Sequence, residues 1–246
     1  MIVAIDAGNS RIKWGLHDGS RWATQGALAT VDVTWLAEAA EDWPADAEVV
    51  VCNVAGDRVG EGIHTVLAAR RLRVRHFRST AACCGVSNRY DRPAQLGADR
   101  WAALVGARAS VSGACVVVCA GTATTIDVLS ADGEFRGGLI LPGFDLMRAA
   151  LANNTAQLPL AEGAYHPLPR NTADAIVSGC MNAQLGAIER MYAHVAGQPG
   201  AVCLLTGGAA TRLLPGLHVP ARLAENLILD GLLHFARATP PPGDRS

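Results

Sequence analysis

Lysine is almost absent from this chain. Of its 21 lysine and arginine residues only Lys13 is a lysine, and the net charge at pH 7 is −1. Aromatic residues make up 5% of the sequence, and no basic run occurs. Nucleic-acid binding relies on clustered cations and stacking aromatic rings, so the composition gives it little support and favours a small-molecule ligand.

Long apolar runs and CxxC motifs are also missing. No stretch approaches the roughly 20 apolar residues that cross a bilayer, and the first residues have neither the basic region nor the cleavage site of a secretory signal. We therefore expect no membrane association. The cysteines form no CxxC pair and several lie in apolar segments, which is typical of a reduced, cytoplasmic protein. They are Cys52, Cys83, Cys84, Cys115, Cys119, Cys180 and Cys203.

Several common catalytic motifs are absent as well. The sequence contains no GxxxxGK[ST] and no GxGxxG after a strand, so neither a P-loop nor a Rossmann dinucleotide site is indicated. HExxH and GxSxG are missing too, and the histidines are isolated. A nucleotide site in this chain would need a different construction.

The two halves of the sequence begin alike. Residues 2–17 and 114–129 each read as an apolar strand, a bend of small and hydroxyl residues, and a second strand. We interpret this as an internal duplication with a boundary near residue 110. The expected fold is α/β, with one domain over 1–110 and another over 111–246. Each would hold a mixed sheet flanked by helices, with a ligand cleft between the domains.

The first bend has the composition of an anion site. Gly8, Asn9 and Ser10 supply backbone amides, and glycine lets a phosphate approach the chain closely. Asp6 ends a buried strand, where a carboxylate is costly unless it is paired or near a cation such as Mg²⁺. Lys13 follows in the second strand. An alternative stays open for each residue. Asp6 could simply cap the turn, and Lys13 could be a lysine that remains by chance in a sequence biased towards arginine.

The second bend is Gly121-Thr122-Ala123-Thr124-Thr125, which offers amides and hydroxyls for further phosphates. Alone it is equally an ordinary turn. Thr206-Gly207-Gly208 follows a later strand and has the small residues that let backbone lie flat against a base or ribose, although it too reads as a turn. Together the two bends favour phosphate binding.

A carboxylate for chemistry is found at Asp99, in Gly97-Ala98-Asp99-Arg100 at the start of a helix. There it could accept a proton from an attacking hydroxyl, while Arg100 could grip a carboxylate of the acceptor. A helix-capping aspartate beside a salt-bridging arginine is the competing interpretation. Asn171 and Thr172 read first as a helix N-cap, with a hydroxyl that could also face a ligand.

The ordered set of these motifs resembles the type III pantothenate kinases, or Bvg accessory factor-like proteins. The resemblance covers most of the chain. It is carried by Asp6-Ala-Gly-Asn-Ser-Arg-Ile-Lys13, Gly97-Ala-Asp-Arg100, Gly121-Thr-Ala-Thr-Thr-Ile-Asp127, Gly137-Gly138, Pro142-Gly143, Asn171-Thr-Ala-Asp-Ala-Ile-Val-Ser-Gly179 and Thr206-Gly-Gly208.

This resemblance implies the fold of the acetate and sugar kinase/Hsp70/actin superfamily, with two ribonuclease H-like, actin-like ATPase domains. It implies ATP-dependent phosphorylation of pantothenate to 4'-phosphopantothenate, the first step of coenzyme A synthesis. Family members are cytoplasmic homodimers that use Mg²⁺ and commonly need K⁺ or NH₄⁺. In the dimer, the helix after Thr172 would pack against the partner.

The resemblance also implies roles for individual positions. Asp99 matches the proton acceptor, and Asp6 would lie near Mg²⁺, through water. The ATP-contacting positions would be Asp6, Ala7, Gly8, Asn9, Ser10, Arg11, Ile12, Lys13 and Thr122. The pantothenate-contacting positions would be Tyr90, Gly97, Ala98, Asp99, Arg100 and Thr172.

One position departs from the family pattern. Cys119 stands where the family often carries an aspartate that helps to hold the monovalent cation. A thiol is a poor ligand for K⁺, which prefers hard oxygen donors. Two other functions remain open: a sugar kinase of the same superfamily, and a non-catalytic regulator with the same fold.

Overall fold

The computed structural model describes residues 1–155 and 162–239, which form two compact units. The first unit contains residues 1–110 and 226–239, and the second contains residues 111–225. The break after Ser110 is therefore where the sequence predicts it. The far end of the predicted second domain differs, because residues 226–239 belong to the first unit.

The first unit is built on a five-stranded sheet in the order β3-β2-β1-β4-β5. β1, β2 and β3 are antiparallel neighbours, whereas β4 and β5 run parallel to β1. Alternate residues of β1 are buried on opposite faces, so one strand serves two layers. The strands of this sheet are β1 (Ile2–Ala7), β2 (Arg11–His17), β3 (Trp22–Ala29), β4 (Glu48–Asn53) and β5 (Arg73–His76). They are followed in the sequence by the hairpin of β6 (Ala82–Cys83) and β7 (Val86–Asn88).

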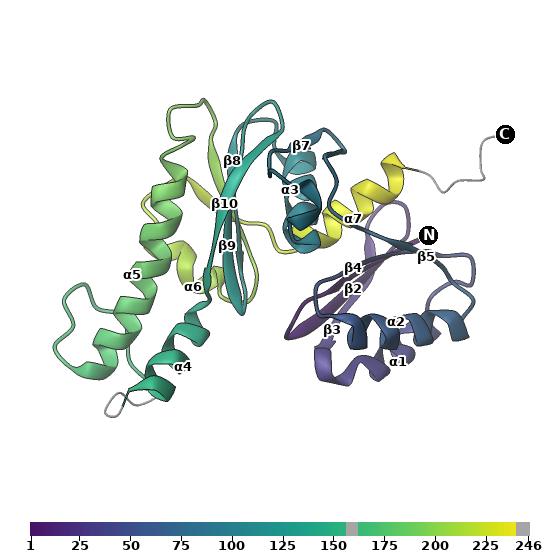
Figure 1. The fold of residues 1–246 in the computed structure, drawn as a ribbon, viewed down its shortest axis with the longest axis horizontal. Coiled ribbons are helices and arrows are strands. Elements are labelled where there is room, and N and C mark those ends of the chain that lie inside the picture. Colours follow the sequence, from purple (N-terminus) through teal and green to yellow (C-terminus); the bar gives the residue numbers. More distant parts are fainter. Residues whose placement is uncertain (156–161, 240–246) are drawn as a thin grey trace. The chain divides into compact units, whose positions relative to one another are not determined.

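Helices cover both faces of this sheet, as Figure 1 shows. Val3, Ile5 and Ile12 point into a core that α1 and α2 close from one side. The other face carries α3 and α7, which pack against each other; α7 also packs against β1, and α3 against β4. These elements are η1 (Thr30–Trp35), α1 (Leu36–Glu41), α2 (Asp57–Ala69), η2 (Pro93–Gln95), α3 (Ala98–Ser110) and α7 (Leu227–Ala238).

The second unit repeats the strand order of the first. Its sheet contains β12-β11-β8-β9-β10, with β8, β9 and β10 antiparallel and β11 and β12 parallel to β8. The third, second, first, fourth and fifth strands thus follow one another in both sheets, as a duplication predicts. The strands are β8 (Cys115–Ala120), β9 (Ala123–Leu129), β10 (Glu134–Pro142), β11 (Val202–Thr206) and β12 (Ala221–Leu223).

One face of the second sheet is covered by α5, α4 and α6 (Figure 1). Ile176, Met181 and Ile188 of α5 join Val116 and Val118 of β8 in a continuous apolar core. The expected α/β class with two helix-flanked mixed sheets is therefore confirmed. The remaining elements are α4 (Phe144–Asn154), α5 (Thr172–Tyr192), α6 (Ala210–Leu213) and η3 (Leu214–Gly216).

No helix in residues 1–155 and 162–239 combines the length and the apolarity that crossing a membrane requires.

Candidate active site

The first predicted bend is a tight turn held in place by Thr30. The Gly8 amide donates to the Arg11 carbonyl at 3.0 Å, which closes the turn. Thr30 then uses both of its groups on the same turn: its hydroxyl donates to the Gly8 carbonyl at 2.7 Å, and its amide donates to the Ser10 carbonyl at 3.1 Å. Nothing in the sequence singles out Thr30, because it lies 20 residues beyond the bend that it fixes.

Not every residue of the predicted ATP segment can offer its side chain to a ligand. Ala7 and Ile12 are fully buried in the core beneath α1 and α2. Gly8 is half-buried, whereas Asn9, Ser10 and Arg11 are exposed. The segment therefore splits into two structural side chains and a turn that solvent can reach.

Asp6 lies on the opposite face of the sheet from that core. It pairs with Lys13 across the antiparallel strands and with Cys52 of the parallel neighbour β4. The Asp6 side chain is 8% exposed, and its Oδ1 atom has no hydrogen-bond partner within residues 1–155 and 162–239. An uncompensated buried carboxylate is costly, so this atom has the character of a ligand-binding group.

Asp99 brings a second carboxylate to the same face. The pKa of Asp6 is raised to about 7, chiefly by burial and also by the Asp99 charge, while the Lys13 ammonium opposes both effects. The same two aspartates help burial to raise the pKa of the Cys52 thiol. Two carboxylates and one ammonium group thus interact at the ends of β1, β2 and α3, which supports the sequence-predicted grouping of Asp6, Lys13 and Asp99.

Asp99 is positioned by the first turn of α3. Its Oδ1 accepts a hydrogen bond from the Arg100 amide at 2.8 Å. A side chain at Gly97 would crowd that oxygen at 2.7 Å, so the glycine leaves room for the carboxylate. The helix-capping interpretation is therefore partly correct, yet Asp99 remains half-buried and not enclosed.

Arg100 is held by Tyr90. The buried guanidinium donates from Nη1 to the Tyr90 hydroxyl at 2.9 Å and lies 5.6 Å from the centre of that ring. Tyr90 is in turn fixed by Asn88, whose Oδ1 accepts from the Tyr90 amide at 3.1 Å. The Asn88 side chain also donates to the carbonyl groups of Thr80 and Pro93, each at 3.2 Å.

These contacts bring Tyr90 to Arg100 and Gly97 to Asp99. Asn88 is a positioning residue that sequence reasoning did not identify. Its signal is a buried amide side chain between two loop segments, which only the three-dimensional structure reveals.

At the second predicted bend, the backbone around Gly121 contacts two other backbone segments, at Gly143 and at Gly207. The Gly121 amide donates to the Ala123 carbonyl at 3.1 Å, and the Gly143 amide donates to the Thr122 carbonyl at 2.8 Å. A Cβ atom on Gly143 would overlap the Gly121 and Thr122 carbonyl oxygens. Gly207, with φ of +97°, is packed in the same way against the Ala120 carbonyl. Glycine is therefore required on both sides of the bend that carries the exposed Thr122.

Thr172 begins α5 and is exposed. The N-cap is Asn171, whose side chain accepts a hydrogen bond from the Asp174 amide at 2.9 Å. The N-cap interpretation is thus confirmed for Asn171 and leaves the Thr172 hydroxyl outside that contact.

A cavity of about 330 Å³ lies elsewhere in the second unit. The guanidinium groups of Arg148 and Arg212 lie 5.7 Å and 4.4 Å from the centre of the Phe144 ring, and Tyr165 and Met181 complete much of the lining. Its lining residues differ from the predicted site residues, so this cavity was not predicted from sequence patterns.

Comparison with known proteins identifies the family. The profile of the type III pantothenate kinase family matches residues 2–194. A type III pantothenate kinase of Aromatoleum aromaticum is 56% identical over 237 residues, which cover 96% of this chain and 98% of that protein. The one from Dechloromonas aromatica is 50% identical over 236 residues, covering 96% and 99%.

Solved structures with low sequence identity share the fold. A Campylobacter jejuni protein assigned to the Baf family of transcriptional activators superposes with a TM-score of 0.68 at 20% identity, covering 97% of this chain and 98% of that one. A Sinorhizobium meliloti protein assigned as a 2-dehydro-3-deoxygalactonokinase gives 0.63 at 18% identity, covering 98% and 100%. At these identities the similarity shows a shared fold.

Proposed function

Because this chain belongs to the type III pantothenate kinase family, we propose that it transfers the γ-phosphoryl group of ATP to the primary hydroxyl of pantothenate. The product is 4'-phosphopantothenate, which starts coenzyme A synthesis. The observation that carries the site assignment is the buried Asp6 oxygen, which has no hydrogen-bond partner among the residues that the structure describes, opposite Lys13 and with Asp99 close enough to raise its pKa.

Asp99 is the proposed proton acceptor. Phosphoryl transfer needs an oriented hydroxyl, a group to take its proton, and neutralisation of phosphate charge. Asp99 is half-buried at the N-terminal turn of α3, where the hydrogen bond from the Arg100 amide orients it. Arg100, stacked on Tyr90, is suited to bind the pantothenate carboxylate through its planar fork.

The turn from Asp6 to Lys13 and the Thr122 bend are the proposed contacts for the ATP phosphates. Lys13 supplies a compact, mobile charge beside the turn of Gly8, Asn9 and Ser10. Thr122 contributes an exposed hydroxyl on a bend that its glycine neighbours hold rigidly.

Magnesium fits the Asp6 environment. Mg²⁺ takes oxygen ligands and usually keeps waters while binding one or two carboxylates together with phosphates. Asp6 offers one such carboxylate with a buried oxygen that has no hydrogen-bond partner in the described part of the chain. When bound there, the cation would neutralise charge on the ATP phosphates.

A monovalent cation fits less well. Cys119 presents a thiol, and in the strand register it lies opposite Thr125 and beside Thr206. Hydroxyls suit K⁺ but a thiol does not, so we propose that turnover depends only weakly on K⁺ or NH₄⁺. We assign no step of the reaction to a monovalent cation.

The proposed form of the protein is a cytoplasmic homodimer. Tyr165 and Leu168 precede Thr172 and are 45% and 87% exposed, which supports burial of this segment against a second copy. Sedimentation of the wild-type protein and of Leu168→Glu tests it: the proposal predicts a dimer that this charge weakens. A monomeric wild type would overturn it.

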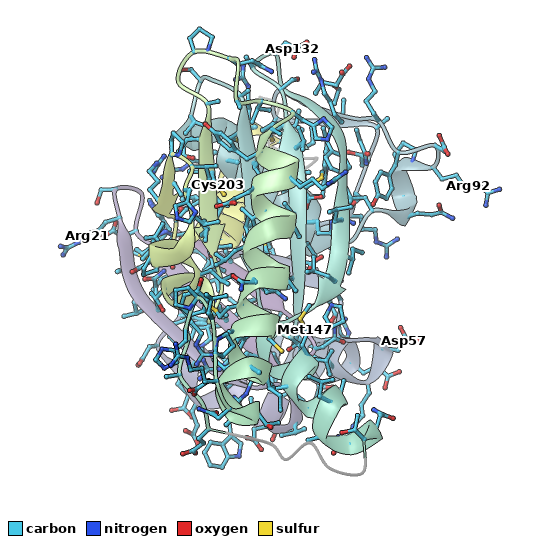
Figure 2. All side chains as sticks on the ribbon, turned by 90° about the vertical axis from the view of Figure 1, so that its left-hand side faces the viewer. Arg21, Asp57, Arg92, Asp132, Met147 and Cys203 are labelled. Atoms are coloured by element: carbon cyan, nitrogen blue, oxygen red, sulfur yellow. The ribbon has the colours of Figure 1, made fainter. Side chains whose placement is uncertain are left out.

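The decisive experiment is an ADP-release assay with pantothenate, run with and without K⁺. Asp99→Asn should keep ATP binding and lose at least about 100-fold in turnover, the usual contribution of a general base. Asp57→Asn is the matched control, since Asp57 is also an aspartate in a first helical turn and points outward from the surface (Figure 2). ADP release with sugars only would favour the sugar kinase, and failure to release ADP with any tested acceptor would favour the regulator.

A further inference from the structure

Two adjacent cysteines form the tip of the β6–β7 hairpin. The Sγ atoms of Cys83 and Cys84 are 3.3 Å apart, and both residues are half-buried. A disulfide bond is about 2.05 Å long, so the two sulfurs need to approach by roughly 1 Å to form one. The catalytic roles assigned above use neither thiol.

The backbone conformation of this turn favours a residue other than cysteine at position 84. Cys84 has φ of +50° and Gly85 has φ of +77°, and Cys83 pairs with Val86 around them. Two successive positive φ angles define the tight hairpin turn that favours Asn-Gly or Asp-Gly. A cysteine at the first position is strained, which points to a use for the sulfur rather than for the backbone.

We propose that Cys83 and Cys84 form a reversible redox site, closing an eight-membered disulfide ring when a small-molecule disulfide such as oxidised glutathione is available. The ring would be strained, because adjacent Cα atoms lie closer together than those of ordinary disulfides. Strained disulfides are easily reduced again and are typical of regulation rather than of structure.

The disulfide between Cys83 and Cys84 forms in two thiol–disulfide exchange steps. The Cys84 thiolate attacks one sulfur of the small disulfide, the bond between its sulfurs breaks, and one small thiolate leaves. Cys83 then attacks the Cys84 sulfur, and the second small thiolate leaves. The protein dithiol loses two electrons and two protons, and the small disulfide becomes two thiols.

The order of attack follows from the environment of Cys83. Burial raises its pKa to about 12, and the hydrogen bond and charge of Cys84 contribute to that rise. Cys83 therefore does not supply the first thiolate. Once Cys84 is in a mixed disulfide its charge is gone, so Cys83 ionises more readily at the moment when it has to attack.

The hairpin is connected to the proposed substrate residues within the first unit. β7 ends at Asn88, which fixes the Tyr90 amide, and Tyr90 fixes Arg100. The Asn88 amide also donates to the Ala81 carbonyl at 2.9 Å, at the start of the same hairpin. β7 packs against α3, the helix that begins at Asp99. Ring closure at the tip would therefore displace the residues proposed to hold the acceptor.

The experiment exposes the folded protein to oxidised glutathione and analyses the peptide containing both cysteines by mass spectrometry. The expected product has lost two hydrogen atoms and carries no glutathione, and dithiothreitol reverses the change. This readout is independent of activity, so it separates failure of this inference from failure of the proposed function. A peptide that stays reduced would overturn the inference.

Two variants test the sequence of events. Cys84→Asn places the favoured residue in the turn and should fold normally, form no ring and keep its kinetics in oxidised glutathione. Cys83→Ser should retain one glutathione on Cys84. Isolation of the Cys83→Ser protein without glutathione would disprove the proposed order.

The kinetic consequence rests on the proposed function. Ring closure should raise the KM for pantothenate several-fold and change the KM for ATP less, and reduction should restore both. An oxidised protein with unchanged kinetics would show that the hairpin is not a regulatory site.

Discussion

Asp6 lies directly opposite Lys13 in the antiparallel pairing of β1 and β2, yet the Asp6 pKa is raised to about 7. The ammonium group lowers that pKa, but burial and the Asp99 charge together outweigh it. The pair is therefore not a stabilising salt bridge. Its arrangement keeps a carboxylate available for a cation and a phosphate at the expense of stability.

Asp6→Asn should make the ligand-free protein more stable at pH 8 and inactive. A carboxyl group whose folded pKa exceeds its unfolded value of 3.8 destabilises the native state as pH rises from about 4 to about 7. The full cost is present above pH 7 and is on the order of 4 kcal/mol at most. Urea unfolding at pH 5 and pH 8 measures it.

The wild type should lose more stability between pH 5 and pH 8 than Asp6→Asn does. Adding Mg²⁺ with ATP should stabilise the wild type and have much less effect on the variant. Equal pH dependence of the two proteins would contradict the buried-carboxylate interpretation.

Arg100→Lys should raise the KM for pantothenate about tenfold, a loss of about 1.4 kcal/mol, with a smaller change for ATP. Lysine keeps the charge but loses both the planar fork and the stacking on Tyr90. Arg92→Lys is the matched control, since Arg92 is exposed on the neighbouring loop (Figure 2). Steady-state kinetics with each substrate varied distinguishes the two effects.

Gly106→Ala should strongly destabilise the first unit, because α3 and α7 cross there. A Cβ atom on Gly106 would overlap the Leu227 carbonyl oxygen, and one on Gly231 would overlap that of Ala102. Overpacking of this kind costs about 1–3 kcal/mol or more. Thermal unfolding measures the loss.

The matched control for this substitution is Gly186→Ala within α5, where an added Cβ atom meets nothing within 4 Å. This variant should be about 0.5–1 kcal/mol more stable, the usual advantage of alanine in a helix interior. Equal destabilisation by both substitutions would rule out the crossing as the cause.

His17→Asn should weaken the loss of stability on acidification. The His17 Nδ1 accepts a hydrogen bond from the Gly19 amide at 3.0 Å, while Arg237 of α7 lies 3.3 Å from the same atom. Burial, and then the Arg237 charge, lower the His17 pKa, and both outweigh the opposing charges of Asp18 and Asp230. The native state therefore favours neutral His17, and stability falls as pH drops below the ordinary histidine value of 6.5.

The asparagine oxygen can replace Nδ1 as an acceptor but does not titrate in this range. Unfolding measured between pH 5 and pH 7.5 should show a shallower slope for His17→Asn than for the wild type. His64→Asn, at an exposed position of α2, should leave the slope unchanged.

Sequence patterns predicted the parts of the fold that are locally encoded. The two hairpins at residues 2–17 and 114–129 have strong apolar strands on either side of small residues, and both are present. β3 (Trp22–Ala29) was not predicted, because as an edge strand it has little buried apolar surface to mark it. β12 (Ala221–Leu223) is too short to show a period.

Long-range relationships were harder to predict. A closing helix near Glu225–Arg237 is apparent from its apolar residues, but its packing against α3 depends on Gly106 and Gly231, which are 125 positions apart. Likewise, Asp99 is visible as a carboxylate at a helix start, whereas its electrostatic effect on Asp6 depends on how α3 packs on the first sheet. Such proximity arises only from tertiary packing.

The membership of α7 in the first unit has a consequence for biosynthesis. Since α7, which packs against β1, is translated after the whole of the second unit, the first sheet emerges from the ribosome long before this helix does. The second unit, by contrast, is continuous in sequence and can finish folding first. A nascent chain would thus present an unfinished N-terminal half, and ligand binding at the first turn would await synthesis of α7.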